Sequence, residues 1–333
     1  MHRSILTAAL VSALSLVTTT ASAVTELRYA TAAPENTPWG AYLKKTVAAA
    51  EKAAEGELKI NIYFSSQLGD EQTVLRQTVR GRIDISGQSN TATSLVVPEI
   101  AVLSAPYLFK DAQQSDCVFD NHVQDIFGPM LDNKGLVLIS YVEVGYNTLF
   151  SHEPILRPKD AVGVKMRLPP TLAATSYWKR AGGSGVPMGV VDMVPALKTG
   201  QVKALQTSTV YGVAIGLHKL APNVTYAQIS HDIGTITVSK KTWKKLNEKQ
   251  RGALRLMANY VDELRKGIRG AEQALLGKME KAGINVIRPA GEDAASWRSY
   301  AAAAQQDLVE GIGPTAKPIW DKVVAAKKAC GGA

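Results

Sequence analysis

The sequence predicts an α/β protein made of two lobes, and three observations support this fold class. Segments typical of strands alternate with segments typical of helices along almost the whole chain. At 333 residues, the chain is long for a single compact core. A helical pattern over residues 248–282 would be about 50 Å long, which is wider than one lobe of ordinary size. We therefore expect a long helix that packs against both lobes.

Local patterns place the individual strands and helices in order. Apolar runs or strict alternation indicate strands, apolar residues at three- and four-residue spacing indicate helices, and glycines mark the ends. The expected strands cover residues 27–32, 58–64, 83–86, 136–144, 164–168, 186–188, 204–206 and 224–227. The expected helices cover residues 39–55, 71–80, 172–180, 192–198 and 210–218. Gly145 is expected to end the strand that precedes it.

The long helix has one alternative interpretation. Its apolar residues repeat without a convincing break from residue 248 to residue 282. Two shorter helices, broken near Gly267 or Gly270, would also fit, because an interior glycine costs about 1 kcal/mol.

The first 23 residues are typical of a secretory signal peptide. His2 and Arg3 form a short polar, positively charged start, residues 5–17 form an apolar run, and residues 21–23 are the small residues of a cleavage site. We expect an exported mature chain that begins at Val24. No cysteine follows the cleavage site, so no lipid anchor is indicated, and no later apolar stretch reaches the roughly 20 residues that span a bilayer.

The charge of the chain permits acidic ligands. The formal net charge is +9, which becomes +8 when Arg3 is removed with the signal peptide. Nucleic-acid binding would require a basic stripe with stacking aromatic residues, whereas the lysines and arginines here are scattered. We expect no nucleic-acid partner.

Arg167 is the leading candidate for ligand binding. It lies near the end of the apolar strand in the segment VGVKMRLPP, where Pro169 and Pro170 force the chain to turn. Ligands of open α/β sheets bind in the crevice beyond the carboxyl ends of the strands. A guanidinium held there offers two parallel N–H donors to a carboxylate. This pattern favours a carboxylate receptor.

Two cysteines, Cys117 and Cys330, remain in the mature chain. In an oxidising compartment they are expected to form a disulfide that ties the C-terminal tail to the first lobe. The alternative is two unpaired thiols, because spacing in the sequence does not show proximity in space.

The sequence contains no pattern that predicts an enzyme. The histidines are scattered without an HExxH motif, and the two cysteines form no CxxC pair, so no metal site is expected. Ser184 lies in GGSGV, which lacks the final glycine of the GxSxG nucleophile motif. The strand and helix pattern at the start also lacks the GxGxxG turn. We expect no catalytic residue and no cofactor.

Several ordered segments give the chain a family resemblance from about Leu27 to Trp297. They are FSSQLGDEQ at 64–72, VRGRIDIS at 79–86, APYLF at 105–109, KDAVGVKMRLPP at 159–170, VPM at 186–188, ALKTGQV at 196–202 and SKKTWKKL at 239–246. Each segment is weak alone, but together and in order they are specific. The chain resembles the solute-binding proteins of tripartite ATP-independent periplasmic (TRAP) transporters, in the branch that binds dicarboxylates and other organic acids.

The resemblance implies a two-lobed periplasmic binding protein fold with a long hinge-spanning helix. It implies a receptor that captures an organic acid between its lobes and delivers it to the small and large TRAP membrane subunits. We expect the chain to be a monomer. We expect lobe I to contain residues 24–145 and about 233–265, lobe II to contain residues 146–232 and about 266–315, and residues 316–333 to form a C-terminal tail. A sensory binding protein that presents its ligand to a receptor would have the same sequence features, and a periplasmic enzyme is a third alternative.

The resemblance also assigns roles to individual residues. Arg167 matches the arginine that pairs with the ligand carboxylate in the family. The chain has Asn147 where many members carry a second arginine, and Thr207 where an asparagine is usual. Since a buried carboxylate without a partner is costly, these two differences favour a monocarboxylate with a less polar body over a dicarboxylate.

The remaining candidate ligand-binding residues lie near strand ends, turns and the start of the first helix. Aromatic residues can supply apolar walls with polar tips, and the alternative for each of them is core packing. The aromatic candidates are Tyr107, Phe109, Tyr146, Trp178 and Tyr211. The other candidates are Trp39, Ser89, Asn90, Pro169, Met188 and His231, the last with a hinge histidine as its alternative.

Overall fold

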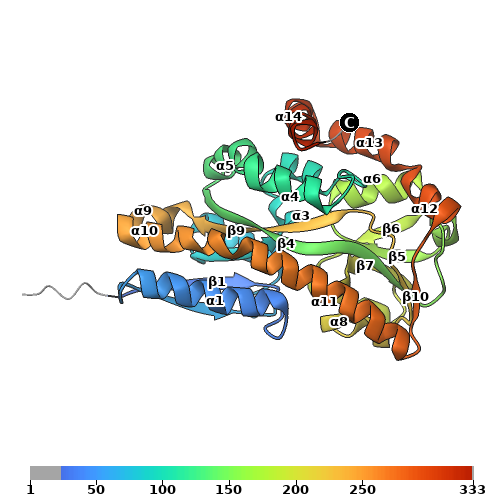
Figure 1. The fold of residues 1–333 in the computed structure, drawn as a ribbon, viewed down its shortest axis with the longest axis horizontal. Helices are drawn as coiled ribbons and strands as arrows, with labels where there is room; N and C mark the ends of the chain where they lie inside the picture. The colour runs from blue at the N-terminus through green and yellow to red at the C-terminus, as the bar shows by residue number, and fades with distance from the viewer. Residues whose placement is uncertain (1–23, 332–333) are drawn as a thin grey trace, which may run out of the picture.

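The structure, a computed structural model, describes residues 24–331 and confirms the expected α/β class (Figure 1). The expected signal peptide lies outside the described residues. Ten strands form a mixed sheet in the order β2-β1-β3-β9-β4-β7-β5-β6, with β8 beside β4 and β10 beside β8. The strands are β1 (Thr25–Thr31), β2 (Leu58–Tyr63), β3 (Ile85–Ser89), β4 (Leu136–Ser151), β5 (Lys165–Leu168), β6 (Ser184–Pro187), β7 (Ala204–Ser208), β8 (Asn223–Thr225), β9 (His231–Ser239) and β10 (Asn285–Ile287).

Helices cover both faces of this sheet (Figure 1). The α-helices are α1 (Pro38–Ala53), α2 (Glu71–Arg80), α3 (Asn90–Thr93), α4 (Ala112–Asn121), α5 (Val123–Asn133), α6 (Leu172–Arg180), α7 (Met193–Lys198), α8 (Thr209–Ala214), α9 (Lys240–Lys245), α10 (Glu248–Arg255), α11 (Val261–Lys281), α12 (Gly291–Arg298), α13 (Ala301–Ile312) and α14 (Ala316–Ala329). The 3-10 helices are η1 (Pro98–Ser104), η2 (Pro158–Ala161), η3 (Val190–Asp192), η4 (Leu217–Lys219) and η5 (Leu256–Tyr260). No helix among residues 24–331 is both long and apolar enough to cross a membrane.

The bounds of helix α2 follow from the residues that cap its two ends. The carboxylate of Asp70 accepts a hydrogen bond from the Thr73 amide at 2.8 Å, which satisfies a free donor of the first turn. Gly81 ends the helix in the left-handed conformation, with φ of 76°, which glycine adopts without a steric penalty. This helix holds Glu71 at its first position, beside the centre of the sheet.

Strand β4 connects the two halves of the sheet. Its first part pairs with β9 from Leu136 to Tyr146, and its last five residues, 147–151, pair with β7. The expectation that Gly145 ends this strand is wrong. Gly145 has φ of 102° at a register shift, and pairing resumes directly opposite Asp232. A glycine in a strand pattern therefore marks a bulge here, which redirects the strand from one lobe to the other.

Helices α10 and α11, joined by η5, form the expected long helical element beside both lobes (Figure 1). Leu264 and Ile268 pack in the core around β1 and α1, whereas Leu276 and Met279 pack in the core around β7 and α7. The alternative of a break near Gly267 or Gly270 is wrong, because both glycines lie inside α11. The helix tightens instead at η5, and no glycine or proline lies in that segment.

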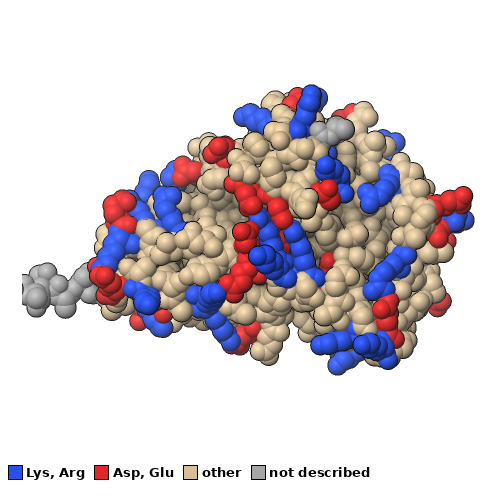
Figure 2. Space-filling model, viewed as in Figure 1, with Lys and Arg blue, Asp and Glu red and all other residues tan. Residues whose placement is uncertain are grey.

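Charged side chains connect α11 to neighbouring elements. Figure 2, drawn in the same view as Figure 1, shows acidic and basic side chains next to each other in the middle of the molecule. Arg269 Nη2 lies 2.6 Å from Asp116 Oδ1 and 2.9 Å from Glu143 Oε2. Arg265 pairs with Asp120, one turn further along α4. These pairs fasten the long helix to α4 and to the crossing strand β4.

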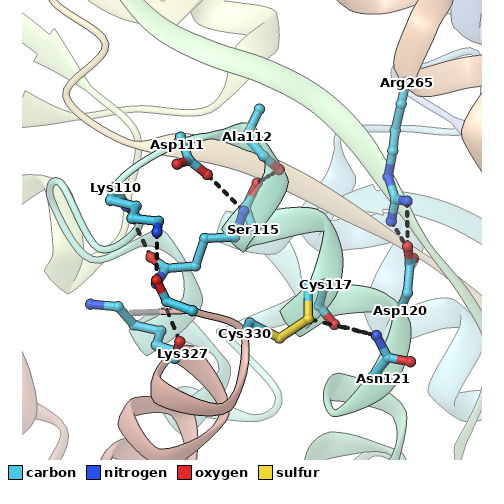
Figure 3. Close-up of a disulfide and its surroundings, with 12 residues drawn as sticks. Lys110, Asp111, Ala112, Ser115, Cys117, Asp120, Asn121, Arg265, Lys327 and Cys330 are labelled. Atoms are coloured by element: carbon cyan, nitrogen blue, oxygen red, sulfur yellow. Dashed lines mark hydrogen bonds and ion pairs between the residues drawn. A yellow bond between two sulfur atoms is a disulfide. The ribbon is translucent and has the colours of Figure 1, made fainter. Parts of the chain in front are cut away.

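Cys117 and Cys330 form a disulfide, with Cα atoms 5.8 Å apart (Figure 3). Cys117 lies on α4 and Cys330 follows the last turn of α14, so the bond joins positions 213 residues apart. Residues 316–329 form the helix α14, and its Val323 and Ala326 pack in the core that contains η1 and α4. The bond therefore links α14 to α4, the helix that also forms ion pairs with α11.

Candidate functional site

A cavity of about 1070 Å³, part of it open to solvent, lies between the two halves of the sheet. The first half contributes residues of α1, β1, β3 and β9, and the second half contributes residues of β5, β7 and α8. Val142 and Val144, on the crossing strand β4, line it between the two halves. A ligand in this cavity would contact both lobes.

Arg167 is held inside this cavity by backbone carbonyl groups. Its Nε donates to the Met188 carbonyl at 2.9 Å, and its Nη1 donates to the Gln206 carbonyl at 2.6 Å. The residue is 2% exposed, and burial lowers its pKa to about 10, so it stays charged at neutral pH. These contacts leave the Nη2 amino group without a protein acceptor among residues 24–331. The guanidinium is therefore rigidly oriented and still has donors for a ligand.

Three acidic residues share the cavity with Arg167, and two of them influence its charge directly. Glu71 accepts hydrogen bonds from the Ser89 amide at 2.6 Å and the Ser89 hydroxyl at 2.9 Å, and burial raises its pKa. Burial also raises the pKa of Asp232 to about 7, although a hydrogen bond from Asn147 opposes this shift. Asp70, the third, is the cap of α2. No second lysine or arginine among residues 24–331 lines the cavity.

Most of the wall is apolar. Trp39, on the first turn of α1, donates its indole N–H to the Glu143 carbonyl at 2.8 Å, so its ring is fixed beside the crossing strand. Further large apolar or aromatic side chains of the wall come from α1, β4, β9, α8 and α11, in addition to Tyr29 of β1 and Val190 of η3. They are Tyr42, Leu43, Val142, Val144, Tyr211, Ile236 and Leu264. Such a wall favours a ligand with some apolar surface.

Several polar groups in the cavity wall were missed by the sequence analysis. The Tyr29 hydroxyl, both polar atoms of the Gln88 amide and the Ser208 hydroxyl are buried without a hydrogen-bond partner among the described residues. Buried polar groups are normally paired, so these groups are available to a ligand or water. Gln88 and Ser208 lie at strand ends, which is a usable signal, whereas nothing in the pattern around Tyr29 distinguishes it from a core residue.

Six of the predicted site residues line the cavity. Ser89 lines it through a hydroxyl that is already bonded to Glu71, and it also caps α3. The six are Trp39, Ser89, Arg167, Pro169, Thr207 and Tyr211. They converge because the ends of β3, β5 and β7 and the first turns of α1 and α8 face the same space.

Three predicted residues lie behind the cavity wall instead of in it. Asn90 is 1% exposed, and its amide donates to the Ile100 carbonyl and to the Ser104 hydroxyl. Asn147 donates to the Ser230 hydroxyl at 2.6 Å in a small adjoining hollow. Met188 packs its side chain in a core, and only its backbone carbonyl serves the site, through Arg167. These three residues support the site from behind.

Three further predicted residues lie elsewhere. Phe109 packs edge-on against Phe119 in a core, with ring centroids 5.5 Å apart. Tyr146 stacks on His231 at 4.7 Å, and His231 Nε2 lies 2.9 Å from Glu143 Oε1. All three line a separate hollow together with Tyr107. Since successive side chains of a strand point to opposite faces, His231 points away from the cavity that Asp232 lines.

Comparison with known proteins identifies the chain. A model of the bacterial extracellular solute-binding proteins of family 7 matches residues 29–311. The chain belongs to this family. Its members are the solute-binding proteins of TRAP transporters, which confirms the resemblance seen in the sequence. The family serves transport and is not a family of enzymes.

Individual relatives are distant in sequence and similar in fold. A solute-binding protein of Chromohalobacter salexigens is 25% identical over 257 residues, 76% of each chain. The sialic acid-binding periplasmic protein SiaP of Vibrio cholerae is 24% identical and covers 72% of this chain and 75% of its own. The sugar acid-binding protein DctPAm of Advenella mimigardefordensis, solved with galactonate, has a TM-score of 0.87 at 21% identity, covering 92% of this chain and 99% of its own. This likeness confirms the two-lobed fold of the family 7 protein.

Proposed function

We propose that this family 7 protein is exported by cleavage after Ala23, binds a small organic acid with one carboxylate between its lobes, and delivers it to TRAP membrane subunits. The observation that carries the proposal is the buried guanidinium of Arg167, which two backbone carbonyls orient and whose Nη2 group has no protein acceptor among the described residues. A planar pair of donors in this arrangement matches one carboxylate.

The charges of the cavity support a monocarboxylate over a dicarboxylate. Arg167 is the cation of the cavity wall within residues 24–331, and Glu71 and Asp232 lie beside it. A second ligand carboxylate would be desolvated without a cationic partner, which is costly. A ligand with one negative charge avoids this penalty.

The related proteins support an acid as the ligand class. The relative SiaP is named for binding sialic acid, and the structural neighbour DctPAm was solved with galactonate. Both ligands are sugar derivatives with one carboxylate. The unpaired polar groups of Tyr29, Gln88 and Ser208 would suit the hydroxyl groups of such a ligand.

A thermal-shift screen against organic acids, followed by calorimetry, tests the proposal. A ligand that binds only the folded protein raises its apparent stability by RT ln(1 + [L]/Kd). Arg167→Ala should weaken binding of the best acid by about 2 to 5 kcal/mol, because a buried carboxylate loses its charged partner. Arg167→Lys should not restore full affinity, since a point charge does not reproduce the planar fork.

Arg76→Ala is the matched control, because Arg76 is exposed on α2 outside the cavity. It should bind like the wild type. Binding by Arg167→Ala within twofold of the wild type would overturn the proposal, and so would a best ligand that is uncharged or a dicarboxylate. Uptake of that acid by vesicles that carry the membrane subunits should depend on the protein.

A further inference from the structure

Asp232 lies at the point where strand β9 crosses between the lobes, and its side chain belongs to the cavity wall. Successive residues of a strand point to opposite faces, and Asp232, Gly234 and Ile236 all line the cavity. Ile233, between them, packs in the opposite core with η1 and α5. The alternation places the Asp232 carboxyl group in the same space as the Arg167 guanidinium.

The hydrogen bonds of the two buried acids beside Arg167 differ. Both oxygens of Glu71 already accept a hydrogen bond from Ser89, one from its amide and one from its hydroxyl. A carboxylate can accept about four hydrogen bonds. Asn147 supplies at most one to Asp232, because its amide nitrogen also donates to the Ser230 hydroxyl at 2.6 Å. Asp232 therefore has acceptor capacity that residues 24–331 do not fill.

The negative charge of Asp232 would repel a ligand whose only polar group is a carboxylate. A carboxylate on Arg167 would lie in the same cavity as the negative charge of Asp232, and Glu71 adds to it. Burial raises the pKa of Asp232 to about 7, so the group is partly ionised at neutral pH. A ligand that offers Asp232 a hydrogen-bond donor would turn this repulsion into an attraction.

We propose that Asp232 is a specificity residue, which accepts a hydrogen bond from a hydroxyl or ammonium group on the ligand whose carboxylate pairs with Arg167. The inference rests on the proposed function. It names the ligand class more closely: a monocarboxylate that carries a donor group, in preference to the same carbon skeleton without one. Hydroxy acids and amino acids both meet this description, and the test separates them.

The first experiment is a thermal-shift screen with acids in matched sets. Each set contains a 2-hydroxy acid, the 2-amino acid and the unsubstituted acid on one skeleton, for example lactate, alanine and propionate, or leucate, leucine and 4-methylpentanoate. We expect the donor-bearing members to bind at least tenfold more tightly. If no acid stabilises the protein, the proposed function and this inference both fail. If unsubstituted acids bind within threefold of the others, the inference fails and the proposed function stands.

The second experiment uses Asp232→Asn, which keeps the shape of the side chain and removes its charge. Calorimetry should show that the preference for the donor-bearing acid falls at least tenfold, in part because the unsubstituted acid now binds more tightly. An ammonium ligand should lose most of its affinity, whereas a hydroxyl ligand should lose less, because the amide oxygen still accepts its hydrogen bond.

Asp125→Asn is the matched control, since Asp125 is an exposed acid on α5 outside the cavity. It should leave both affinities and their ratio unchanged. A residue with only a structural role would weaken all ligands of a set by the same factor. An unchanged ratio in Asp232→Asn, with the circular dichroism spectrum of the wild type, would therefore overturn the inference.

Discussion

At the scale of single residues, local sequence predicts a functional side chain when the backbone alone determines where it lies. Arg167 was identified from a strand followed by two prolines, and the structure holds it through the carbonyls of Met188 and Gln206. Asn90 and Asn147 occupy similar places in the sequence, yet their amide nitrogens donate to other groups of the protein. Which groups stay unpaired depends on neighbours that are distant in sequence, so Tyr29 gave no signal that separates it from a core residue.

Asp232 should also make stability depend on pH. Because burial raises its pKa to about 7, the folded protein keeps a proton that the unfolded chain releases near pH 4. The contribution of Asp232 to the free energy of unfolding is fully present below about pH 4, and it is lost as the pH rises through about 7. Glu71 and Arg167, which share the cavity with it, and its chain neighbour His231 remain in the variant Asp232→Asn.

Urea unfolding of the wild type and of Asp232→Asn, at pH 5 and at pH 8, measures this effect. From pH 5 to pH 8, the free energy of unfolding of the variant should rise by about 2 kcal/mol relative to that of the wild type. This figure is smaller than the full pKa shift would give, because the side chain is partly exposed. Asp125→Asn should show no such gain. A difference between wild type and Asp232→Asn that does not change with pH would contradict this prediction.

At the scale of elements, glycines in strands illustrate what a pattern leaves open. The sequence predicted an end at Gly145, whereas the structure has a bulge there, because pairing with β9 continues on both sides of it. Gly234, on β9, has a different role. A Cβ atom at this position would lie 2.6 Å from the Gln88 carbonyl oxygen and 3.1 Å from Val142 Cγ2. The close approach of β3 and β9 at the cavity therefore requires glycine.

Gly234→Ala should destabilise the protein by about 1 to 3 kcal/mol, because the backbone of β3 has to shift to make room. Denaturant unfolding measures the change. The control is Gly252→Ala in α10, where a Cβ would meet no atom within 4 Å and alanine should stabilise the helix by about 0.5 to 1 kcal/mol. Equal effects of the two substitutions would refute this account of Gly234.

At the scale of the whole molecule, two crossing strands and one long helix connect the lobes. β4 and β9 carry the chain across, and α11 packs in the cores of both sides. The lobe boundaries expected from the sequence stay a prediction. This construction is compatible with hinge closure around a ligand, which is common in periplasmic binding proteins.

Closure should make the molecule more compact. Small-angle scattering with saturating ligand should give a smaller radius of gyration than scattering without it. Arg167→Ala, at the same ligand concentration, should keep the larger radius because it binds poorly. An unchanged radius for the wild type at saturation would count against closure.

The disulfide acts on the whole chain because it joins positions 213 residues apart. Intact mass before and after reduction should show the bond in protein prepared from the periplasm, and the same spectrum should show a chain that begins at Val24.

The double variant Cys117→Ser/Cys330→Ser should lose about 2 to 5 kcal/mol of unfolding free energy, since a long closed loop restricts the unfolded chain. Reducing agent should not change the stability of the double variant. Two freely alkylated thiols in unreduced protein would refute the pairing.

The sequence by itself determined the fold class, most strands, the helices α1, α2, α6, α7 and α8, the arginine at the end of β5 and the family, because these depend on local patterns and on ordered short motifs. The tertiary structure alone decided which polar groups stay unpaired in the cavity and which acid lies beside Arg167. It also decided that His231 and Tyr146 line a different hollow. The physical reason is that the direction of a side chain follows from its strand's register, and its free hydrogen-bonding capacity follows from partners far away in the chain.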